Sequence, residues 1–152
     1  MRIFKSLGAV ALMLAALFVW GTSAQAQRPH YMHALSNLRQ ARALLETDTR
    51  PGFVMDRDRA MEEVDNAIRE VKMAARDEGR NPRFTPPPAS AGDPDRPMRS
   101  ALSLLDDARD DIARGEDVGE DRGLQNRALK HIDEARHALG HALHKMEHEH
   151  RY

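Results

Sequence analysis

Histidines recur near the end of the chain at intervals that place them on one side of an α-helix. The spacing is four, three and four residues, and the set is His137, His141, His144 and His148. At about 100° per residue these positions fall within roughly 60° of arc. Neutral imidazole is the commonest metal ligand in proteins. The pattern predicts a site for Cu(II), Ni(II) or Zn(II), with Glu147 or Glu149 as oxygen partners.

Other chemistries lack the residues that they need. A chain without cysteine forms neither a c-type haem attachment nor a disulfide. A di-iron centre needs Glu-x-x-His on two helices; Glu134-x-x-His137 supplies one, but Asn66 stands where a second histidine is required. The sequence contains no Gly-x-Ser-x-Gly motif and no glycine-rich phosphate loop. We therefore expect no haem, no di-iron centre and no enzymatic activity.

The N-terminal segment has the features of a secretory signal. Arg2 and Lys5 give a basic start, an apolar run covers residues 7–20, and residues 24–26 read Ala-Gln-Ala. Such an ending is typical of a cleavage site, and the apolar run is short for a membrane span of about 20 residues. The sequence predicts cleavage after Ala26, a periplasmic or secreted location, and no membrane attachment afterwards.

The remaining chain, residues 27–152, has the size of one domain. Subtracting Arg2 and Lys5 from the 23 basic residues leaves 21 against 24 acidic residues, a net charge of about −3. A nucleic-acid-binding domain shows a clustered basic face, which this composition does not favour. We therefore expect no nucleic-acid partner.

Apolar residues recur at helical spacing in four stretches of this domain. The expected helices cover residues 31–46, 56–77, 98–114 and 124–148. Arg50-Pro51-Gly52 separates the first two, and a glycine-containing acidic turn separates the last two. Five of the eight prolines lie between Pro82 and Pro94, which predicts an extended linker over residues 78–97.

The two halves of the domain have similar sequences. Ala34-Leu35-Ser36, Leu38 and Ala41-Arg42 return as Ala101-Leu102-Ser103, Leu105 and Ala108-Arg109, and Val64-Asp65 with Ala67 returns as Ile132-Asp133 with Ala135. Each half reads helix, turn, helix, and neither hairpin buries its apolar face alone. The sequence predicts an all-α fold: an antiparallel four-helix bundle made of two repeated hairpins, about 31–77 and 98–148, joined by a proline-rich crossover.

Two more histidines, His30 and His33, stand at the start of the first expected helix. If the four helices alternate in direction, this start lies at the same end of the bundle as the end of the last helix. We therefore expect His30 and His33 to join His141, His144 and His148 as metal ligands. The alternative for all of them is a solvated polar face.

The last expected helix resembles the bacterial periplasmic small metal-binding proteins, which are exported, histidine-rich four-helix proteins. The residues that carry the resemblance are His131-Ile132-Asp133-Glu134-Ala135-Arg136-His137-Ala138 and the histidines after them. Those proteins look richer in histidine along every helix, whereas residues 56–77 and 98–114 here contain none. The segment from Pro29 to Ser36 is also similar to a group of uncharacterised exported bacterial proteins.

The resemblance implies a non-enzymatic exported protein that binds or buffers a divalent transition metal. The alternative function is that of a periplasmic interaction or stress-response protein, with a protein partner and an incidental histidine-rich face. A docking role for Pro86-Pro87-Pro88 belongs to that alternative.

Overall fold

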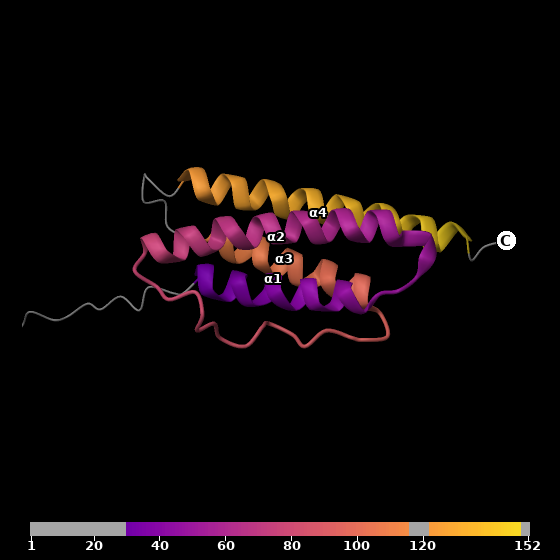
Figure 1. Cartoon of the computed structure of the whole chain (residues 1–152), viewed down its shortest axis with the longest axis horizontal. Helices are drawn as coiled ribbons and strands as arrows, with labels where there is room; N and C mark the ends of the chain where they lie inside the picture. The colour runs from indigo at the N-terminus through magenta and orange to yellow at the C-terminus, as the bar shows by residue number, and fades with distance from the viewer. Residues whose placement is uncertain (1–29, 116–121, 150–152) are drawn as a thin grey trace, which may run out of the picture.

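The computed structural model describes residues 30–115 and 122–149, and all regular secondary structure in those ranges is helical (Figure 1). The elements are α1 (His30–Thr47), a one-turn 3₁₀ helix η1 (Pro51–Phe53), α2 (Val54–Asp77), α3 (Pro97–Ala113) and α4 (Arg122–Glu149). The bounds of the four α-helices lie within two residues of the expected ranges. The all-helical prediction is therefore confirmed for the described residues.

The predicted secretory signal and its cleavage site lie outside the described residues. Within the part of the chain that the structure describes, none of the helices has the length and apolar content that a membrane span requires.

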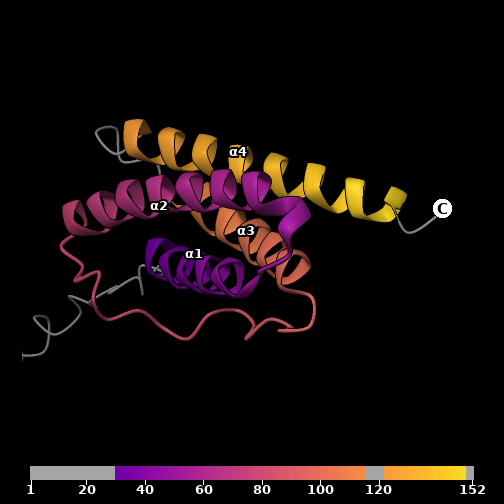
Figure 2. The ribbon, with the colours of Figure 1, turned by 45° about the vertical axis from the view of Figure 1, so that its right-hand side comes forward.

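Each helix packs mainly against two others: α1 and α4 each contact both α2 and α3. Ion pairs join the neighbouring helices: Arg42 of α1 pairs with Asp65 of α2, and Arg109 of α3 pairs with Asp133 of α4. Figures 1 and 2 show α1 and α4 running one way and α2 and α3 the other. The chain therefore reverses direction between α1 and α2 and between α3 and α4, whereas α2 and α3 run in the same direction.

Much of the core is formed by small and medium apolar residues at corresponding positions of the two halves. Positions in α2 and α4 match at an offset of 68 residues, and positions in α1 and α3 at an offset of 67. The buried pairs are Ala60/Ala128, Val64/Ile132, Ala67/Ala135, Val71/Leu139 and Ala74/Ala142, then Ala34/Ala101, Leu38/Leu105, Ala41/Ala108 and Leu45/Ile112. Alanine at alternate positions of a seam brings the helix axes close together.

The connection between α2 and α3, residues 78–96, runs back along α1 for the length of the bundle (Figure 1). Side chains of α1 hold its backbone. Arg39 donates to the Pro82 carbonyl (2.9 Å), Gln40 donates to the Ala91 carbonyl (2.7 Å), and Asn37 Oδ1 accepts from the Ala89 amide (2.7 Å). This linker is thus a docked part of the fold, which explains how a connection of unusual length is accommodated.

Candidate metal-binding face

The histidines of α4 that share one side of the helix are all exposed. This histidine face consists of His137, His141, His144 and His148. The other side of the same helix, marked by Ile132, Ala135, Leu139 and Ala142, is buried against α2 and α3. The core face and the histidine face therefore lie on opposite sides of α4, as the residue spacing predicts.

His144 and His148, one helical turn apart, have ring centroids 4.4 Å apart and ring planes at 75° to each other. A metal–nitrogen distance of about 2.0–2.1 Å puts the ring centre roughly 3.2 Å from the ion. Two such rings at a right angle have centres roughly 4.5 Å apart, whereas a tetrahedral angle gives roughly 5.2 Å. The observed 4.4 Å is close to the first of these values, and in the structure the two rings meet edge to face. Because both side chains are exposed, their rings can turn their nitrogens toward a shared ion.

His141 is positioned by a carboxylate of another helix. Its Nδ1 lies 3.3 Å from both carboxylate oxygens of Asp56, in the first turn of α2. A carboxylate in this position fixes the ring orientation and leaves Nε2 available to a metal. Sequence reasoning missed Asp56, because its proximity to His141 depends on how α2 packs against α4.

The last turns of α4 are held against the rest of the bundle. Lys145 Nζ lies 3.4 Å from the Gly52 carbonyl and 5.7 Å from the centre of the Phe53 ring. Glu147 pairs with Arg99 of α3 at 2.7 Å. The Glu147 carboxylate is therefore engaged by an arginine beside the histidine face, and the side chain of Glu149 lies outside what is described.

The start of α1, which contains His30 and His33, lies at the opposite end of the bundle from the end of α4 (Figure 1). Burial raises the pKa of Asp111, near the end of α3, and the nearby charges of Arg114, His33 and His30 oppose that rise. The expectation that these two histidines join those at the end of α4 is wrong. The reason is the linker, which carries the chain back along the bundle so that α3 ends, rather than begins, beside the start of α1.

His131 belongs to the helix interface and not to the histidine face. Its Nδ1 is 2.7 Å from Oε2 of Glu63 in α2, and the two side chains are 26% and 21% exposed. This contact ties α2 to α4 near the middle of both helices, which is a structural role.

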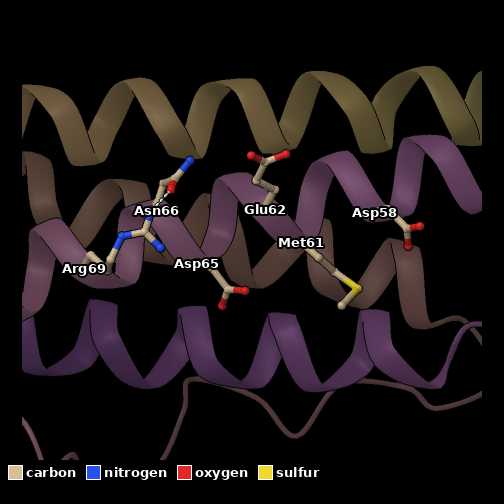
Figure 3. Close-up of a pocket in the computed structure, with 6 residues that line it drawn as sticks. All are labelled: Asp58, Met61, Glu62, Asp65, Asn66 and Arg69. Carbon is tan, nitrogen blue, oxygen red and sulfur yellow. Dashed lines mark hydrogen bonds between the residues drawn. The ribbon is translucent and has the colours of Figure 1, made fainter.

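A shallow polar groove of 400 Å³ runs along one side of α2 (Figure 3). Its lining residues all come from that single helix and are Asp58, Met61, Glu62, Asp65, Asn66 and Arg69. Figure 3 shows Arg69 bonded to Asn66, and Asp65 is engaged by Arg42 of α1. The lining offers no nucleophile, and a groove on one helix does not enclose a substrate. It is a solvated helix face.

Comparisons of the chain with protein-family models, with curated proteins and with solved structures find no match. Among the residues in the described ranges, no three His, Asp or Glu side chains are grouped so that they could hold a metal ion. The histidine face can therefore supply two imidazole ligands, and any further ligands of a metal ion must come from outside the described residues.

Proposed function

We propose that this protein binds a divalent transition metal through the histidine face of α4, with Cu(II) or Ni(II) preferred over Zn(II). The observation that carries the proposal is the 4.4 Å separation of the His144 and His148 rings, which suits two neighbouring ligands of a tetragonal ion. Two ligands on one rigid helix also lose less conformational freedom on binding than two ligands on a flexible loop. The role is metal binding or buffering, not catalysis.

We also infer that the bundle consists of a repeated antiparallel hairpin. Arg42 Nε donates to Asp65 Oδ1 at 2.6 Å, and Arg109 Nε donates to Asp133 Oδ1 at 2.9 Å, so matching residues of the two halves form matching ion pairs. The buried pairs given above occupy corresponding positions of the two halves.

The repeat bears on function because the histidine face has no counterpart in the first half. At the offset of 68, the corresponding positions hold Arg69, Met73 and Arg76 of α2 and Arg80 of the linker that follows it. The same helical framework therefore forms without histidine at these positions. Packing does not require the histidines of α4, which favours a role in binding.

In this proposal residues 1–26 direct export, and the protein that meets the metal starts at Gln27 in the periplasm or outside the cell. That chain retains every described element of the bundle.

The test is calorimetric titration of untagged protein starting at Gln27 with Cu(II) or Ni(II) at neutral pH. Wild type is expected to bind one or a few ions, and replacing His141, His144 and His148 together by Ala is expected to remove most of that binding. Affinity should fall as the solution is acidified, since imidazole binds metal only when neutral. Far-UV circular dichroism should be unchanged, because exposed substitutions rarely disturb a fold.

The matched control is the double variant His30→Ala/His33→Ala, which removes two histidines at the other end of the bundle. It should bind as wild type does. Equal, negligible heats in wild type and the triple variant would mean that the histidines form a plain polar surface.

An interaction or stress-response protein is the second candidate, and Phe84 is the observation that favours it. This aromatic side chain is 77% exposed in the linker, just before Pro86-Pro87-Pro88. A partner that docks there should be captured equally with and without chelator and lost on Phe84→Ala. Capture that needs metal and the histidine face would favour the first candidate.

A further inference from the structure

The His144–His148 pair fills only half of the square plane that Cu(II) or Ni(II) prefers. Nearby groups have contacts of their own: Glu147 pairs with Arg99, and Nδ1 of His141 lies against Asp56. Among the described residues no third side chain completes a site with the pair. One copy of the protein therefore offers two ligands and leaves two coordination positions to be filled.

The pair lies in the last turns of α4, beyond the start of α2. His141 sits opposite the first turn of α2, through its contact with Asp56, and Glu147 sits opposite the first turn of α3, through Arg99. Figures 1 and 2 show this end of α4 projecting beyond the other helices. The 3₁₀ helix η1 contacts this end of α4 through the Phe53 ring, which lies next to Lys145. The outer side of these turns is accessible to another molecule of the same size.

Resting on the proposed metal binding, we infer that one ion is shared by two copies of this chain, each of which contributes His144 and His148. A two-fold axis through the ion brings four imidazoles together and completes the square plane without any other ligand. An isologous contact of this kind closes on itself and gives a dimer, not a filament. The charges that flank the pair are of both signs, so two copies meet without strong repulsion.

A shared ion makes the dimer depend on the ratio of metal to protein. With half an equivalent of metal, each ion is bound by two copies and the dimer predominates. With a large excess of metal, each copy takes an ion of its own, water completes the coordination, and the dimer dissociates. Without metal the protein is a monomer.

Sedimentation velocity of the untagged protein starting at Gln27, at neutral pH, tests this with Cu(II) as the probe. We expect monomer with chelator, dimer at half an equivalent of Cu(II), and monomer again at tenfold excess. Electron paramagnetic resonance at half an equivalent should detect four coordinated imidazole nitrogens, and at excess two. His148→Ala should reduce the dimer to its level in metal-free wild type, whereas the control His33→Ala, at the other end of the bundle, should dimerise as wild type does.

The outcomes separate this inference from the proposed function. Calorimetric copper binding by a protein that stays monomeric at every ratio would overturn the shared site and leave metal binding intact. Unchanged dimerisation of His148→Ala would also overturn the shared site. An absence of copper binding to wild type would remove both proposals.

Discussion

At Gly92 the linker packs closely against Leu44 of α1, and replacement of this glycine by alanine should destabilise the protein. Its backbone lies in the left-handed region, with φ of 74°. A Cβ atom added there would lie 2.5 Å from Cδ1 of Leu44 and 3.2 Å from Cβ of Ser100. Leu44 is only 7% exposed in α1. Alanine at this position therefore meets both backbone strain and a steric overlap.

Two penalties and one gain set the size of the effect. A non-glycine residue in a sparsely populated backbone conformation costs about 1–3 kcal/mol, and an extra carbon in a packed site costs about 1–3 kcal/mol. The reduced freedom of the unfolded chain returns about 0.4–1 kcal/mol. Gly92→Ala should lower the free energy of unfolding by about 2–4 kcal/mol.

Urea denaturation followed by far-UV circular dichroism measures this change, and Gly140→Ala is the matched control. Gly140 is exposed inside α4, and a Cβ atom there would meet nothing within 4 Å. Because alanine has the higher helix propensity, Gly140→Ala should raise the free energy of unfolding by about 0.5–1 kcal/mol. The same substitution is thus expected to lower the free energy of unfolding at Gly92 and to raise it at Gly140.

A change of less than about 0.5 kcal/mol in Gly92→Ala, the range of ordinary surface substitutions, would refute the docked position of the linker. The double variant with Leu44→Ala identifies the cause of any larger loss. If the overlap contributes, the combined effect is smaller than the sum of the two single effects.

Three further predictions concern polar contacts. Asn37→Ala leaves a linker amide without its acceptor and should cost about 1–3 kcal/mol in chemical denaturation; an unchanged midpoint would contradict that role. Hydrogen bonds from Arg50 lower the pKa of Asp48, so its carboxylate stabilises the fold above the unfolded pKa of about 3.9, and this contribution is lost as the pH falls through the folded pKa. The difference in unfolding free energy between wild type and Asp48→Asn should therefore shrink below about pH 4, and a constant difference would argue against the assignment. His131→Ala should cost about 1 kcal/mol, by loss of its contact with Glu63, while calorimetry shows unchanged metal affinity; weaker binding would place His131 in the site.

Local pattern was enough to predict the helices and the sides that they bury. The apolar repeat in α4 predicts that Ile132 and Leu139 face the core and that His141 and His148 face away, and the structure has them so. This succeeds because helix formation and burial of one face depend on residues three and four apart, which the sequence displays directly. The correspondence of Asp65 with Asp133 in the repeat is also visible in the sequence, because the residues around each of them are alike.

Tertiary structure alone decided which ends of the helices meet. The 19 linker residues between α2 and α3 reach roughly 60 Å when extended, whereas α2, with 24 residues, is roughly 36 Å long. A connection of this length lets α3 start at either end of the bundle, so the linker sequence does not determine its direction. Packing of α3 on α1 and α4 does, and it separates His30 from His144. The contacts of Asp56 with His141 and of Gly92 with Leu44 follow from the same packing, because they join residues that no local pattern relates.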